Sequence, residues 1–174
     1  MTAVEAVKAG LVLLLAALVQ VSIAAWIEVA EGHPDVVLVV LVALALVRGP
    51  IFGAAAGFWA GIVLDTAALE TFGLTSLLLT LVGYWAGRFG DVTTRASAHP
   101  PLIAVALGTL GFALGSAVIH FMLGETTSAS QFFAAVLVPT LALNMLLAYP
   151  LYGLIRRVFP PAVRPRRGEV SAAV

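Results

Sequence analysis

Few side chains in this sequence could take part in chemistry, and they are scattered. Asn144, Gln20 and His120 each stand alone inside an apolar stretch. Arg48 and Asp65 each follow one. No nucleophile, base and orienting group recur at a spacing that would bring them together, so no catalytic set is predicted. The chain has no cysteine, which excludes thiol catalysis and thiolate metal sites. We therefore expect no enzyme activity, no metal and no cofactor.

Structural roles are the favoured interpretation of the polar residues. Asn144 lies in the middle of the last apolar stretch, where an amide hydrogen bond between helices is worth only ~1 kcal/mol and fixes register. Arg48 reads as a topology anchor, with contact to a cytoplasmic partner as the alternative. Asp65 is expected to reach water or a local donor at a helix end, although charged groups at membrane depth also line functional pathways.

The elements that must position these residues are apolar. Of the 174 residues, 61% are hydrophobic and only 10% are charged. A soluble domain would lack the polar surface to cover such a core, whereas a helix bundle in a bilayer needs an apolar exterior. The composition predicts an all-α integral membrane protein.

Apolar runs bounded by charge mark the membrane spans, since crossing the hydrocarbon core takes about 20 residues. Four runs are clear: Ala9 to Ile27, Leu74 to Ala86, Leu102 to Leu123, and Phe132 to Phe159.

The stretch from Val36 to Leu64 is read as two further spans, Val36 to Val47 and Ile51 to Leu64. Gly49-Pro50 punctuates the helix, and one continuous helix would bury Arg48 near the bilayer centre. Both halves barely reach across, so a re-entrant hairpin is the alternative.

The charges fit six spans with both termini in the cytoplasm, because short cytoplasmic loops carry the excess of Lys and Arg. Six spans place every basic residue inside, namely Lys8, Arg48, Arg88, Arg95, Arg156, Arg157, Arg164, Arg166 and Arg167. The outer side receives Glu28, Glu31, Asp35, Asp65, Glu70 and Glu125. Five spans would export Arg88 and Arg95.

The chain is expected to form one transmembrane domain over residues 1–159 and a basic, proline-containing tail over 160–174. That tail is expected to be disordered and to lie against anionic lipid headgroups. A signal peptide over residues 1–24 is the alternative for the first segment, but its apolar run exceeds the usual core of about 7 to 15 residues.

Glycines recur every four residues on several segments, so that one helix face has almost no side chain. Gly53, Gly57 and Gly61 form the longest such series, and Gly83 and Gly87 repeat the spacing. Such faces let helices approach closely in membranes. Internal packing is the favoured interpretation, and binding of a partner helix is the alternative.

The pattern of glycine, proline and charged residues in the central apolar segments resembles that of the rod shape-determining protein MreD family. It consists of Pro34-Asp35, Arg48-Gly49, Gly53, Gly57-Phe58, Gly61, Leu64-Asp65, Gly73-Leu74, Val82-Gly83-Tyr84 and Gly87. These positions cover residues 34–88.

The resemblance implies a non-catalytic scaffold in the bacterial inner membrane that serves cell elongation and peptidoglycan synthesis. It implies MreC as the partner and, through MreC, MreB, RodA and a class B penicillin-binding protein, with no nucleic acid involved. A lipid-facing groove along the face of Gly53, Gly57 and Gly61 is the hypothesis for the MreC site. The family's architecture is similar to that of the S components of energy-coupling-factor vitamin transporters, and substrate capture by such a component is the alternative function.

Overall fold

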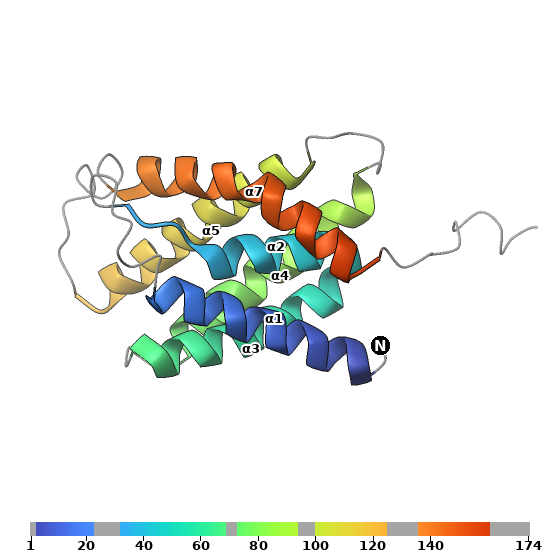
Figure 1. Ribbon diagram of the computed structural model, residues 1–174. Coiled ribbons are helices and arrows are strands. Elements are labelled where there is room, and N and C mark those ends of the chain that lie inside the picture. Colours follow the sequence, from blue (N-terminus) through green and yellow to red (C-terminus); the bar gives the residue numbers. More distant parts are fainter. Residues whose placement is uncertain (1–2, 23–31, 69–72, 94–99, 125–135, 161–174) are drawn as a thin grey trace, which may run out of the picture.

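The structure, a computed structural model, describes residues 3–22, 32–68, 73–93, 100–124 and 136–160. Within these ranges the chain forms helices and no strands (Figure 1). The helices are α1 (Ala3–Ser22), α2 (Val36–Arg48), α3 (Pro50–Ala68), α4 (Leu74–Val92), α5 (Pro100–Met122) and α7 (Val138–Val158). The prediction of an all-α fold is confirmed. Residues 23 and 24, the end of the alternative signal peptide, and residues 161–174 of the predicted tail lie outside the described residues.

Helix α2 is the centre of the bundle and contacts each of the other five described helices. Its residues from Val37 to Ala45 are all buried, and Leu38, Leu41 and Leu44 have no exposed surface. In lipid an apolar helix can face either acyl chains or other helices, and here the neighbouring helices cover α2 on every side. The sequence of α2, with no polar residue before Arg48, matches that position.

The chain reverses direction at Gly49, between α2 and α3, as the sequence predicts. Gly49 adopts φ 96°, a left-handed conformation that glycine accepts without steric cost. Its N–H donates to the carbonyl of Ala45 at 2.7 Å and ends α2, while its own carbonyl accepts from Gly53 at 2.9 Å and begins α3. Pro50 is the first residue of α3. The N–H of a first helical residue has no partner within the helix, so proline, which lacks this N–H, is well accepted there.

Helix bounds differ from the predicted spans mainly at the ends. Helix α1 begins at Ala3, six residues before the apolar run that starts at Ala9, and α3 continues to Ala68. The hydropathy pattern locates apolar segments, whereas the helical hydrogen bonds continue through the charged residues that flank them. Helix α7 begins at Val138, and residues 132–135 of the predicted last span lie outside the described residues.

Four described helices are long and apolar enough to cross a membrane: α1, α3, α5 and α7. Helix α2 is apolar but has 13 residues, or about 20 Å of helix, which is less than the ~30 Å hydrocarbon core. An extended segment precedes it, and Gly32 in that segment lies directly against Pro139 and Thr140 of α7. Helix α2 occupies the centre of the bundle, and this segment packs against α7 at one end of it.

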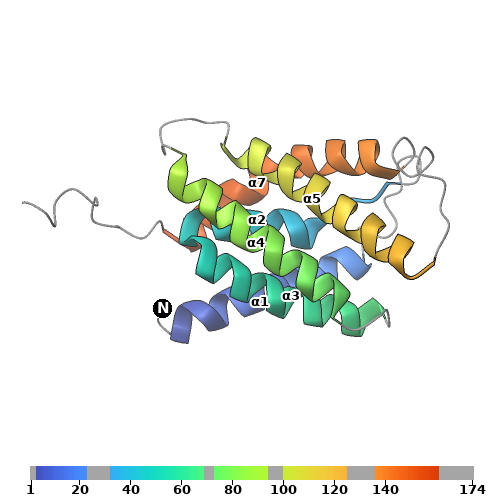
Figure 2. The ribbon, with the colours of Figure 1, turned by 180° about the vertical axis from the view of Figure 1, so that it is seen from behind.

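Successive helices run in opposite directions, so their termini gather at two ends of the bundle (Figures 1 and 2). At one end Arg48 contacts Glu5 of α1 and Phe159, which follows α7. At the other end Asp35 contacts Asn144 of α7. Figure 2 also shows α3 and α4 side by side along their length, in the most extensive helix pair of the bundle.

Candidate functional site

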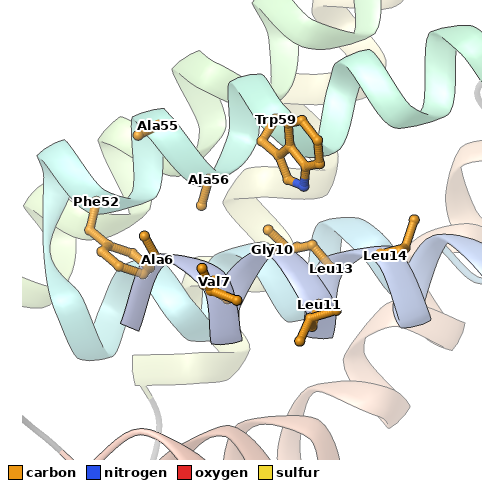
Figure 3. Close-up of a pocket in the computed structure, with 11 residues that line it drawn as sticks. Ala6, Val7, Gly10, Leu11, Leu13, Leu14, Phe52, Ala55, Ala56 and Trp59 are labelled. Atoms are coloured by element: carbon orange, nitrogen blue, oxygen red, sulfur yellow. The ribbon is translucent and has the colours of Figure 1, made fainter. Parts of the chain in front are cut away.

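An open, apolar groove of about 490 Å³ lies between α1 and α3 (Figure 3). Helix α1 lines it with residues between Ala6 and Leu14, and α3 lines it with Phe52, Ala55, Ala56 and Trp59. Every lining side chain is apolar except for the indole N–H of Trp59. A groove of this composition fits another apolar body and offers nothing to a charged or strongly polar ligand.

Small residues on both sides keep the groove open. Ala6 and Gly10 lie one turn apart on α1. On α3, Ala56 points toward α1 (Figure 3), and Ala55 also lines the groove. Ala6 and Ala55 are exposed in the isolated chain. In lipid, such positions allow the backbone of a second helix to approach closely, and van der Waals contact then drives association.

The glycine face of α3 is not open, because α4 lies directly on it. A Cβ atom added at Gly57 would collide with the backbone carbonyl of Leu79, and one at Gly61 would collide with the backbone of Ser76. The hypothesis that Gly53, Gly57 and Gly61 form a lipid-facing groove for MreC is therefore wrong. The backbone of α4 already fills the space that the missing side chains leave.

The other two glycines singled out in the sequence belong to the same helix pair. Gly83 and Gly53 face each other, so that a Cβ on either would meet the carbonyl oxygen of the other. Gly87 lies against the turn between α2 and α3, in contact with Gly49 and Pro50. Together these contacts place α3 and α4 at backbone-to-backbone distance along their length.

Arg48 binds within the chain at the end of the bundle where the basic residues gather. Its Nη1 atom donates to the carboxylate of Glu5 on α1 at 2.7 Å. Its guanidinium group also lies 5.5 Å from the ring centroid of Phe159, which is 1% exposed. A cation over an aromatic face is attracted by the ring quadrupole. Arg48 thus connects α1, α2 and the C-terminal end of α7.

Asn144 is fully buried and holds the opposite end of α2. Its Oδ1 atom accepts from the backbone N–H of Asp35 at 2.8 Å, and its Nδ2 atom donates to the hydroxyl of Thr109 on α5 at 3.0 Å. The Asp35 side chain caps α2 by accepting from the N–H of Leu38 at 3.0 Å. These bonds supply the acceptors that the first turn of α2 lacks inside the bundle.

Gln20 adds a further acceptor from α1. Its Oε1 atom accepts from the N–H of Val37 at 2.8 Å. Helix α1 contacts mainly α2 and α3. Polar contacts fix both of its ends, through Glu5 at one end and Gln20 at the other. This arrangement fixes the position of α1 relative to α3 and with it the width of the groove.

Asp65 is 3% exposed and caps the start of α4. Its carboxylate accepts from the N–H of Gly73 at 2.8 Å, from the N–H of Thr75 at 3.3 Å and from the hydroxyl of Ser76 at 3.3 Å. Asp65 was expected to reach either water or a local hydrogen-bond donor. The structure shows the local donors, and the side chain is too buried to reach water. It connects the C-terminal part of α3 to the first turn of α4.

Two parts of this arrangement were not foreseen from the sequence. The ion pair of Glu5 and Arg48 links residues that are 43 positions apart. No local sequence pattern predicts such a pair. The groove has a signal that could have been read, since Ala6 and Gly10 form a small-x-x-x-small pair on α1. Among the described residues, no group of three or more His, Asp or Glu side chains is placed to hold a metal ion.

Comparison with known proteins identifies the family. The family model for the rod shape-determining protein MreD matches residues 4–159 of the 174-residue chain. No curated protein and no solved structure matches it. The match extends over all the described helices except the first residue of α1, well beyond residues 34–88 that carried the resemblance. The apolar helix bundle and this match agree on a membrane protein with a role in determining cell shape, and the chain belongs to the MreD family.

Proposed function

We propose that this chain is a non-catalytic scaffold subunit of the bacterial cell-elongation machinery, and that the groove between α1 and α3 holds the transmembrane helix of MreC. The observation that carries the proposal is the groove itself. It is open, it is lined by apolar side chains, and it has small residues on both sides. Because it lies along two helices long enough to cross a membrane, its occupant is a membrane-embedded segment.

The proposed site differs from the glycine face in one physical respect. The glycine face of α3 is covered by α4, so a helix from a partner protein has no room there. The groove between α1 and α3 has exposed small side chains at Ala6 and Ala55. A partner helix can cover these small side chains without a steric clash, and the close approach of the two backbones adds van der Waals contact.

The topology that accompanies this function is six membrane crossings in the inner membrane, with both termini in the cytoplasm and a layout similar to that of S components. The described basic residues support it, since Arg48, Arg88 and the Arg156–Arg157 pair all lie at helix ends on one side of the bundle. The positive-inside rule assigns that side to the cytoplasm. Helix α2 crosses in the centre of the bundle. Its ends are surrounded by the neighbouring helices, so a short helix is tolerated there.

Scaffolding fits the polar groups better than substrate capture does. Asp35, Asn144, Thr109 and Gln20 bond to one another or to helix ends. None of these bonds is directed into an open cavity, whereas a vitamin site needs convergent polar groups on its wall. The chemistry of elongation then belongs to the partners, with MreB, RodA and a class B penicillin-binding protein reached through MreC.

The test is to fill the groove and measure retention of MreC. Ala55 is exposed on the α3 side of the groove, so Ala55→Leu adds bulk there without a buried clash. Ala142→Leu makes the same change at an exposed position of α7, away from the groove, and serves as the matched control. We expect co-purification of tagged MreC to fall sharply for Ala55→Leu alone. Equal recovery of MreC with both variants would place the partner elsewhere.

A further inference from the structure

Trp59 supplies the polar group of the groove. Its indole ring is 48% exposed, and the edge that carries the nitrogen is turned toward Gly10 of α1 (Figure 3). A Cβ atom at Gly10 would lie 3.5 Å from that nitrogen, so the donor sits above the position on α1 that has no side chain. Among the described residues the indole N–H makes no hydrogen bond. A tryptophan N–H out of water normally finds an acceptor.

The depth of Trp59 makes this donor unusual. Trp59 is the tenth of the 19 residues of α3, so it lies at the centre of a helix long enough to cross a membrane, about 14 Å from either end. Tryptophan favours the two membrane interfaces, where its N–H meets water or lipid headgroups. Neither reaches this depth, so the acceptor that would satisfy the N–H must belong to whatever fills the groove.

We infer that the groove selects a transmembrane helix that carries a hydrogen-bond acceptor, a Ser, Thr, Asn or Gln side chain, near the middle of the membrane opposite the Trp59 indole N–H. The inference rests on the proposed function and adds the chemistry by which the partner is recognised. Lipid acyl chains are ruled out as the intended occupant, since they have no acceptor at this depth. The small residues Ala6 and Ala55 favour a helix as well, because a helix backbone needs close approach and an acyl chain does not.

The experiment removes the N–H and keeps the ring. Trp59→Phe in the full-length chain deletes the donor while an aromatic side chain remains in the groove. Trp85→Phe is the matched control, because Trp85 is 67% exposed on α4, away from α1. The probe is full-length MreC, titrated against the chain in nanodiscs. An interhelical hydrogen bond in a membrane corresponds to roughly a three- to tenfold change in affinity. We expect a loss of that size for Trp59→Phe and none for Trp85→Phe.

A second measurement locates the acceptor. Each Ser, Thr, Asn or Gln in the MreC span is replaced by alanine, alone and together with Trp59→Phe. One replacement should reproduce the loss seen with Trp59→Phe, and combining the two should weaken binding no further. Additive losses for every such residue would overturn the inference.

The two proposals fail differently. If Ala55→Leu abolishes MreC binding and Trp59→Phe leaves its affinity unchanged, the groove is the site and the hydrogen bond is refuted. If Ala55→Leu itself has no effect, the groove is not the site of MreC, and the inference falls with it.

Discussion

Gly57→Ala should destabilise the bundle, even though alanine is the better helix former. Alanine in place of glycine favours a helix by about 0.5–1 kcal/mol. At Gly57, however, the added Cβ meets the backbone carbonyl of Leu79, and backbone cannot rotate away as a side chain would. Restoring a normal contact of about 3.5 Å requires α3 and α4 to separate by roughly 1 Å, and such a gap forfeits a quarter to a half of the dispersion attraction across it.

The magnitude follows from these opposing effects. Overpacking a well-packed interface costs about 1–3 kcal/mol, and the α3–α4 interface is the most extensive pair in the bundle. After the gain in helix propensity we expect a net loss of about 1–2 kcal/mol in the free energy of unfolding.

The measurement is the unfolding free energy in lipid bicelles by steric trapping, with Gly111→Ala on α5 as the control. A Cβ at Gly111 meets no atom within 4 Å, so that variant should match or exceed the wild-type stability. The reasoning is refuted if Gly57→Ala proves as stable as Gly111→Ala, because α4 would then not lie on the glycine face.

Five further variants test the polar contacts, each by unfolding free energy in the same bicelles. Asp65→Ala removes the acceptor at the start of α4 and should cost about 1–2 kcal/mol, whereas Asp65→Asn keeps a carbonyl oxygen and should cost less; equal losses would contradict the capping role. Asn144→Leu leaves two buried polar groups without their partner and should cost about 1–3 kcal/mol, and wild-type stability would show that the amide is dispensable. Arg48→Ala should cost more than Glu5→Gln, because it loses the aromatic contact as well as the ion pair; equal costs would mean that the aromatic contact adds nothing.

Much of the fold follows from the sequence because apolar length and punctuation are local properties. The break at Gly49 needed only the Gly-Pro pair and the position of Arg48 before it. The helices lie where apolar runs were predicted, with ends that differ because charged residues continue a helix without adding to its hydropathy. Membership of the MreD family could likewise be read from spaced glycines and charges.

The pairing of helix faces could not be read in the same way. In water, the buried face of a helix is apolar and the exposed face is polar, but in lipid both are apolar. Ile51 is 79% exposed and its neighbour Phe52 only 6%, and nothing in their chemistry separates them. The spacing of the glycines on α3 favoured internal packing but did not say which helix packs there, and it left partner binding open as the alternative. The partners of Asn144 could not be predicted, because they lie on other helices, whereas the local donors expected for Asp65 lie at the start of the next helix.

Photo-crosslinking in cells tests the central claim most directly. A photoreactive amino acid replaces Ala55 in the groove in one strain and Ile103 in another, Ile103 being 47% exposed on α5. We predict that irradiation joins MreC to the chain through position 55 and not through position 103. Crosslinks to MreC at position 103, with none at position 55, would contradict the claim that the groove between α1 and α3 holds the partner helix.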